Sequence, residues 1–237
     1  MGIENRIAVI TGATGGLGRI VAKKFADQGM RLVLISTNGE KLQQLVGELN
    51  VEEDHILGLI ADLSLSAAGN EITEKILARF GRIDILLHLV GGWDGGKPVV
   101  EVDREQVESM LQQHLWTTYH LAQSIIPVMT SNHWGRILVI SSPVASSPGA
   151  NLAPYVIGKA AQEALMLAIA QEVKGSRVTA NIILVKTIDT RHEREQRPDE
   201  KNASWTTPEE IAATLLHLCI NESSVINGAR IPLYGGS

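Results

Sequence analysis

Short apolar runs alternate with longer segments of helical periodicity from one end of this chain to the other. Seven runs fit β-strands, namely Ile7–Thr11, Leu32–Ser36, Ile56–Ile60, Ile83–Val90, Arg136–Ser141, Val178–Leu184 and Ala229–Leu233. Six segments between them fit helices, namely Leu17–Gln28, Glu40–Leu49, Ala67–Phe80, Arg104–Thr130, Pro154–Val173 and Pro208–Ile220. Strands rich in Ile, Leu and Val on both faces are typical of a parallel sheet covered by helices on each side. The pattern predicts an α/β fold, a doubly wound parallel sheet of about seven strands.

Bulk properties narrow the function classes. No linker, repeat or composition shift divides the 237 residues, so we expect one domain over residues 1–237. The net charge of -5 gives no electrostatic footprint for nucleic-acid binding. The single cysteine, Cys219, lies in an apolar run and is expected to be a buried hydrophobe. Neither a secretory signal nor a run long enough to cross a bilayer is visible, so we expect no membrane partner and a cytoplasmic location.

A glycine-rich turn joins the first strand to the first helix. Residues 11–18 read Thr-Gly-Ala-Thr-Gly-Gly-Leu-Gly. Glycines in this place allow a tight turn and let the backbone approach a pyrophosphate, which binds at the amino end of the helix. A glycine-rich match is weak alone but much stronger between a strand and a helix. The turn predicts dinucleotide binding.

A tyrosine and a lysine lie one helical turn apart in the fifth helical segment. Tyr155 and Lys159 share a helix face, and Ser142 lies thirteen residues before the tyrosine. A phenol with a pKa near ~10 exchanges protons poorly at neutral pH unless a nearby cation stabilises its phenolate. The pair alone also fits an amphipathic surface.

The glycine spacing T-G-x-x-x-G-x-G, with Ser142, Tyr155 and Lys159, resembles the short-chain dehydrogenase/reductase family over essentially the whole chain. The resemblance implies a Rossmann-type, NAD(P)-binding oxidoreductase that interconverts a carbonyl and a secondary alcohol on a small-molecule substrate, without a metal. The cofactor-binding residues it implies are Gly12, Thr14, Gly16, Leu17, Gly18, Ser36, Thr37, Asp62, Leu63, Gly91, Tyr155, Lys159, Ile188 and Thr190.

The resemblance also implies catalytic roles. Tyr155 is expected to be the general acid/base, Lys159 to lower its pKa and bind the nicotinamide ribose, and Ser142 to polarise the substrate oxygen. A fourth catalytic position, an Asn in the family, is His114 here. The sequence supports two interpretations equally: His114 relays protons behind the lysine, or it only fills the space of the Asn.

Two further segments depart from the family. Where the family has Asn-Asn-Ala-Gly, residues 88–91 read His-Leu-Val-Gly, and its Pro-Gly after the sixth strand is Val185-Lys186. These changes motivate an alternative function, a catalytically inactive dinucleotide-binding regulatory or scaffolding protein. The intact Ser142, Tyr155 and Lys159 favour the enzyme.

The end of the second strand bears on cofactor choice. A carboxylate there would bond the ribose 2′-hydroxyl and repel a 2′-phosphate. This chain has Ser36-Thr37-Asn38, whose small hydroxyls can accept a phosphate. The basic residues that NADP-preferring members often carry at positions 37 and 15 are missing. We expect NADP(H) to be favoured over NAD(H).

Two loops and two helices complete the sequence-based picture. The charged segment 191–201 fits a solvated loop and a substrate lid equally well. For Trp93 and Trp205, packing is favoured slightly over lining a substrate pocket. Family resemblance implies a homo-oligomer, a dimer or a homotetramer, formed through helices Arg104–Thr130 and Pro154–Val173.

Overall fold

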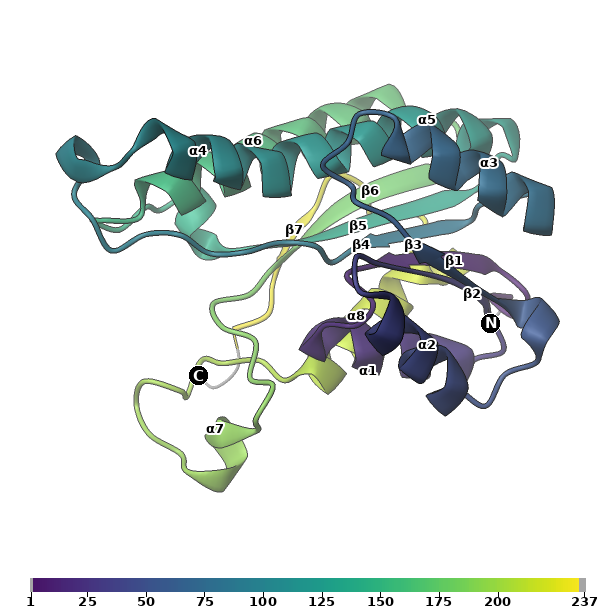
Figure 1. Cartoon of the computed structure of the whole chain (residues 1–237), viewed down its shortest axis with the longest axis horizontal. Helices are drawn as coiled ribbons and strands as arrows, with labels where there is room; N and C mark the ends of the chain where they lie inside the picture. The colour runs from purple at the N-terminus through teal and green to yellow at the C-terminus, as the bar shows by residue number, and fades with distance from the viewer. Residues whose placement is uncertain (1, 235–237) are drawn as a thin grey trace.

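The computed structural model describes residues 2–234 and contains the predicted parallel sheet (Figure 1). Seven strands pair in the order β3-β2-β1-β4-β5-β6-β7. Their bounds are β1 Ile7–Thr11, β2 Arg31–Ser36, β3 Ile56–Ile60, β4 Ile85–His88, β5 Gly135–Ser141, β6 Val178–Leu184 and β7 Arg230–Pro232. The order reverses between β1 and β4, and in such sheets ligands bind outside the carboxyl ends of the strands at this point.

Helices cover both faces of the sheet. One layer holds α1 Gly16–Ala26, α2 Gly39–Glu48 and α8 Pro208–Cys219. The other holds α3 Ala68–Phe80, α4 Arg104–Leu111, α5 Thr117–Ser131 and α6 Ala153–Glu172 (Figure 1). A single helical turn, α7 Glu193–Gln196, lies outside both layers.

Alternation along the central strand divides the apolar core in two. Ala8 and Ile10 of β1 pack in the cluster shared with α1 and α8, whereas Ile7 and Val9 pack in the cluster shared with α3, α5 and α6. This is the period-2 pattern of a strand buried on both faces. Cys219 is fully buried in the first cluster, as expected, and burial raises the pKa of its thiol.

The structure differs from the predicted elements in three places. The strand expected over residues 83–90 covers only 85–88, and the chain beyond His88 leads to Val90 and Gly91 at the cavities. The single helix expected over 104–130 is interrupted by a π-helical turn, η3, at Gln112–Trp116. The helical turn α7 inside the charged segment was not predicted. The other predicted elements were confirmed within a few residues.

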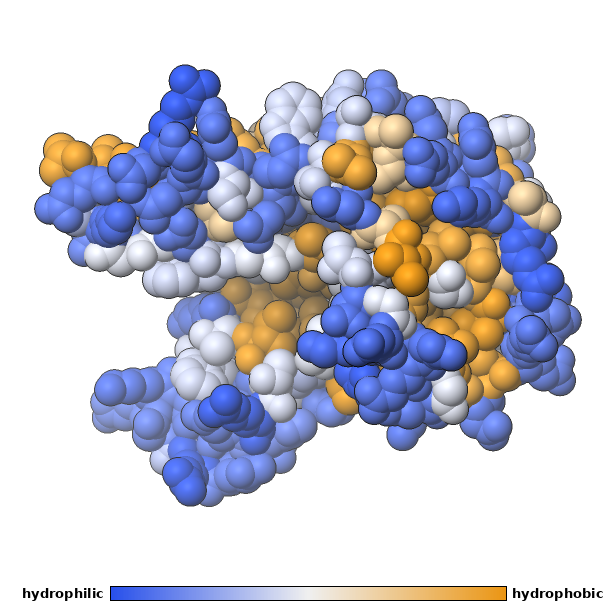
Figure 2. Space-filling view, in the orientation of Figure 1, coloured by the Kyte–Doolittle hydropathy of each residue, from blue (hydrophilic) through white to orange (hydrophobic). Residues whose placement is uncertain are grey.

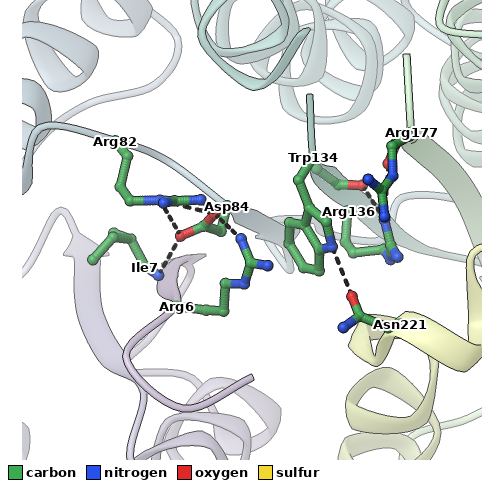
Figure 3. A network of polar contacts seen from close by, with 9 residues as sticks. Arg6, Ile7, Arg82, Asp84, Trp134, Arg136, Arg177 and Asn221 are labelled. Carbon is green, nitrogen blue, oxygen red and sulfur yellow. Dashed lines mark hydrogen bonds and ion pairs between the residues drawn. The ribbon is translucent and has the colours of Figure 1, made fainter. Parts of the chain in front are cut away.

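A polar cluster holds the amino ends of the central strands together, at the opposite end from the strand ends that bind ligands (Figure 3). Asp84 is fully buried; its carboxylate pairs with Arg6 at 2.8 Å and accepts the N–H of Ile7 at 2.9 Å. The Trp134 ring lies between two guanidinium groups, 3.9 Å from Arg6 and 4.3 Å from Arg136. Buried charges are tolerated where they are paired or stacked in this way.

At the carboxyl ends of the strands the molecule is hollowed rather than covered (Figure 2). Two projections, one built on α4 and the start of α6 and the other on residues 186–206 with α7, stand apart on the same side of the molecule (Figures 1 and 2). The hollow between them has apolar side chains in its depth (Figure 2). Within residues 2–234, no helix has both the length and the apolar character needed to cross a membrane.

Candidate active site

Two adjoining cavities lie at the carboxyl ends of the central strands. The larger, about 410 Å³, is bordered by the glycine turn, Tyr155 and Lys159, and the smaller, about 240 Å³, by the end of β2. Both are lined by Gly12 and Val90, so they form one continuous hollow. Together they are lined by every residue that was expected to bind a cofactor.

The glycine turn forms the floor of this hollow. Gly12 has φ +64°, and a Cβ there would lie 3.3 Å from the backbone of Leu89. A Cβ on Gly18 would lie 2.2 Å from the carbonyl oxygen of Gly12, so only glycine fits where α1 meets β1. The backbone is left bare at the amino end of a helix, which is the geometry that accommodates a pyrophosphate.

Short polar side chains surround the smaller cavity. The hydroxyls of Thr14 and Ser36 lie 2.8 Å apart, and Ser36 also accepts the backbone N–H of Asn38 at 3.1 Å. Thr37 is exposed. Asp62 accepts the N–H of Ser64, and bonds from Ser64 lower the pKa of its carboxyl, so it is a fixed anion at this rim.

Tyr155 and Ser142 face each other beside the larger cavity. Tyr155 lies in the first turn of α6 and is half-buried. Ser142 directly follows β5 and is 4% exposed. Burial raises the pKa of the Tyr155 phenol, and a hydrogen bond with Ser142 acts in the opposite direction. A phenolate at this position therefore needs a further positive charge to form near neutral pH.

Lys159 supplies such a charge from the next turn of α6. Its Nζ donates to the carbonyl oxygen of Ile140 at 2.8 Å and to Oε1 of Gln162 at 3.2 Å. An ammonium group has three N–H bonds, so one remains for the cavity. Burial lowers the pKa of Lys159 to about 7, and the carboxylate of Glu163 opposes this shift.

His114 lies in the π-helical turn against these residues. Its Nε2 is 3.1 Å from the carbonyl oxygen of Gly92, and because a carbonyl only accepts, Nε2 carries the proton. Nδ1 is thus a bare acceptor, buried and without a hydrogen-bond partner among residues 2–234. The ring meets that of Tyr155 edge-on at 5.7 Å. A Cβ on Gly91 would come 2.9 Å from His114 Cε1 and 3.7 Å from Lys159 Nζ, so this glycine leaves space between the two side chains.

His88 was noted from the sequence only as a departure from the family, and it proves to be a bracing residue. Thr117 donates to the carbonyl oxygen of Gln113 at 2.7 Å, so it accepts from His88 Nε2 at 3.0 Å. His88 Nδ1 then accepts from Thr11 at 2.9 Å, and Thr11 accepts the N–H of Leu89 at 3.1 Å. Every polar atom of the imidazole is satisfied by β1 and by the start of α5. Burial lowers the pKa of His88 to about 3, which keeps the ring neutral.

The sequence favoured a packing role for Trp93, and the structure places it at the cavity instead. Its side chain is 63% exposed and lines the larger cavity together with Tyr155. Trp205 is half-buried, and its carbonyl oxygen accepts from Arg194 at 2.6 Å. The charged segment is also tied down, because Arg194 bonds Glu210 of α8 at 2.6 Å. No sequence pattern pointed to these ties.

The geometry matches that of known proteins. A family model for short chain dehydrogenases matches residues 6–201. The chain belongs to the short-chain dehydrogenase family. The hydroxy(phenyl)methylsuccinyl-CoA dehydrogenase subunit BbsD of Thauera aromatica is 30% identical over 244 residues, covering 100% of this chain and 98% of that protein. A 2,3-dihydro-2,3-dihydroxybenzoate dehydrogenase of Bacillus subtilis is 30% identical over 202 residues, covering 85% and 77%. A crystal structure of a 3-ketoacyl-(acyl-carrier-protein) reductase of Brucella melitensis complexed with NADH superposes with a TM-score of 0.88 at 24% identity, covering 99% of each chain.

As a short-chain dehydrogenase, the chain is an oxidoreductase that acts between CH–OH and C=O groups with a nicotinamide dinucleotide. The hollow fits that cofactor: a glycine floor that a Cβ would fill, followed by two cavities that run from Ser36 to Tyr155. A bound nicotinamide dinucleotide supplies or accepts the hydride. The protein's own groups must therefore orient the substrate oxygen and move its proton.

Proposed function

We propose that this short-chain dehydrogenase interconverts a ketone or aldehyde and its alcohol in a single domain, with NADP(H) favoured over NAD(H). One observation carries the proposal. Tyr155 and Lys159 line the larger cavity beside the glycine floor, and Ser142 lies against the Tyr155 hydroxyl. A proton donor, its orienting hydroxyl and a cation thus stand where a carbonyl oxygen would be reduced.

The residues have separate tasks in the proposed reaction. During reduction, Tyr155 donates its phenolic proton to the substrate oxygen while Ser142 holds that oxygen by a hydrogen bond. The Lys159 ammonium stabilises the phenolate that remains. In alcohol oxidation the phenolate takes the hydroxyl proton instead, and the substrate carbon loses hydride.

We propose that His114 belongs to a relay behind Lys159 that returns a proton to Tyr155 after each reduction. Its Nδ1 faces the space that Gly91 leaves open, next to the free N–H of Lys159. Burial lowers the pKa of His114 to about 3, so the ring accepts a hydrogen bond as a neutral base and does not compete as a cation. Nδ1 is closed to solvent here, so a small widening of the cavity would let a water bridge it to the Lys159 Nζ and satisfy both atoms.

Replacement of the phenolic hydroxyl tests the mechanism. Tyr155→Phe is expected to abolish turnover in a screen of carbonyl substrates while cofactor titration by fluorescence shows unchanged affinity. Retained turnover would sink the mechanism. A wild-type protein that binds cofactor tightly but turns over nothing would instead favour the inactive regulatory alternative.

The cofactor preference rests on the polar end of β2. Ser36 and Thr37 offer hydroxyls at the smaller cavity, and Asp62, which carries the one carboxylate that lines it within the described part of the chain, is engaged with its own turn. We expect a lower KM for NADPH than for NADH. Thr37→Asp introduces a carboxylate and is expected to reverse this order; an unchanged order would place the 2′-position elsewhere.

We further propose that the substrate carries a six-membered ring. The two relatives named above act on compounds with such a ring, according to their names. Trp93 presents an exposed indole in the catalytic cavity, where stacking on a planar ring contributes roughly 0.5–1.5 kcal/mol beyond its buried area.

Trp93→Ala tests this substrate class. The variant is expected to raise KM about tenfold for a cyclic or aryl ketone while changing KM little for a short aliphatic one. Val225→Ala, which trims an exposed apolar side chain outside both cavities and away from α5 and α6, serves as the control. Equal effects of Trp93→Ala on both substrates would remove the ring from the proposal.

We also propose that the chain forms a homo-oligomer through α5 and α6. Trp116 and Tyr119 near the start of α5, with Ile157 and Leu167 of α6, leave large apolar side chains 37–43% exposed. A second copy of the chain packing on these helices would cover them. Light scattering is expected to give a dimer or tetramer, and Leu167→Glu a smaller species; a wild-type monomer would contradict this.

A further inference from the structure

A buried carboxylate follows the proposed catalytic pair on α6. Tyr155, Lys159 and Glu163 are spaced by four residues, so they stack along one helix face. Glu163 is 5% exposed. A carboxylate with so little contact with water needs partners, and the proposed proton transfer does not itself use this residue.

Glu163 has two partners from different strands. Its Oε1 accepts the hydroxyl of Ser141 at 2.5 Å, in the residue just before Ser142. Its Oε2 lies 2.8 Å from a guanidinium nitrogen of Arg230 on β7. That nitrogen has no aligned hydrogen-bond acceptor within the described chain, so the contact with Arg230 is mainly one of charge. Arg230 keeps 32% of its side chain exposed.

The ammonium of Lys159 is surrounded mainly by neutral groups. Tyr155 faces it from α6, His114 from the π-helical turn and His88 from β4, and both imidazoles are neutral. β5 contributes only the carbonyl oxygen of Ile140. Among residues 2–234, Glu163 is thus the one carboxylate that acts on the buried ammonium, and Arg230 from β7 draws on the same carboxylate.

We propose that Glu163 is a positioning residue that keeps Lys159 protonated during turnover, and that Arg230 limits its effect by sharing its charge. The inference rests on the proposed role of Lys159. An opposite charge within ~4–6 Å favours the charged form of a buried group, and a neighbouring cation weakens that help. The charged state of the catalytic lysine is thereby linked to a strand that does not line either cavity.

Two substitutions should move the pH dependence in opposite directions. Glu163→Gln keeps an acceptor for Ser141 but removes the charge, so the alkaline fall of kcat should begin about one pH unit lower than in the wild type. Arg230→Gln frees Glu163 to act on Lys159, so the fall should begin at higher pH. Arg230→Lys keeps the positive charge and should restore the wild-type profile.

A merely structural role gives a different result. If Glu163 served only to hold Ser141, Glu163→Gln would retain the wild-type profile. Shifts of both variants in one direction would overturn the part assigned to Arg230. Glu172→Gln removes an exposed carboxylate from the end of the same helix and controls for net charge.

A second readout does not depend on turnover. The rate at which Lys159 reacts with acetic anhydride in the cofactor-free protein, followed by mass spectrometry across pH, reports its fraction of neutral amine. Glu163→Gln should shift this titration down and Arg230→Gln should shift it up. An inactive wild type with these shifts would refute the proposed function alone, whereas an active wild type without them would refute this inference.

Discussion

At the scale of single residues, His114 shows how one side chain can be fixed in tautomer and charge by its surroundings. The carbonyl oxygen of Gly92 places the proton on Nε2, and burial keeps the ring neutral at any working pH. What remains is one unpaired acceptor beside Lys159. An unsatisfied buried acceptor costs about 1–3 kcal/mol unless water occupies it, and a relay water at this atom would remove that cost.

Replacing this imidazole separates the two interpretations. His114→Leu removes the acceptor at similar volume and is expected to lower kcat about 100-fold with unchanged cofactor affinity. His114→Asn restores a polar group and should recover much of the rate. Stopped-flow measurement of proton uptake beside hydride transfer gives the check. If the leucine variant kept its kcat, His114 would only fill space.

The residue scale is also where sequence reasoning was most complete. Glycine spacing and the Tyr155–Lys159 interval are local patterns, and the structure places all of these residues around one hollow. Glu163 and Arg230 went unnoticed because they are 67 residues apart in a chain whose pairing only the fold creates. Trp93 was misjudged because exposure depends on what packs against a loop.

At the scale of elements, the π-helical turn η3 helps to position two residues of the site. Its wider turn places His114 toward Lys159 and leaves Thr117 facing His88. The sequence of residues 104–130 fits an uninterrupted α-helix, since one extra residue in a turn leaves little trace in apolar periodicity. The bracing by His88 was equally out of reach, because it joins β1, β4 and α5.

Removing the Thr117 hydroxyl tests this brace. Thr117→Val leaves the Nε2–H of His88 buried without an acceptor and should lower the free energy of unfolding by about 1–3 kcal/mol. Thr214→Val is the control: its hydroxyl also bonds the carbonyl four residues earlier, at 3.1 Å, but on a partly exposed face. Urea denaturation should show a change below about 0.5 kcal/mol for the control. Similar losses in both variants would argue against the brace.

At the scale of the whole molecule, the buried imidazoles predict acid sensitivity. The folded-state pKa values of His88 and His114 are lowered to about 3, whereas an unfolded histidine titrates near ~6.5. Between these values the unfolded chain binds more protons, so stability is full above pH ~6.5 and falls as pH decreases. The loss is about 1 kcal/mol for each histidine at pH 5.5.

Thermal unfolding between pH 7.5 and 5 measures this loss. His88→Asn combined with His114→Asn should flatten the decline of Tm, although it starts from a lower value. His217→Asn removes an exposed imidazole and should leave the slope as in the wild type. A slope that ignores the buried pair would assign the acid sensitivity to other groups.

The fastening at the amino edge of the sheet also bears on how such a protein can diversify. Asp84, paired with Arg6 and Arg82, and the ring of Trp134 fix the strands relative to one another at the end remote from the cofactor hollow (Figure 3). The segments 93–103 and 186–206 project from the other end and contribute little to that fixation (Figure 1). Insertions or exchanges there can change what is bound while the strand register is inherited unaltered, so new specificities can arise without a new fold.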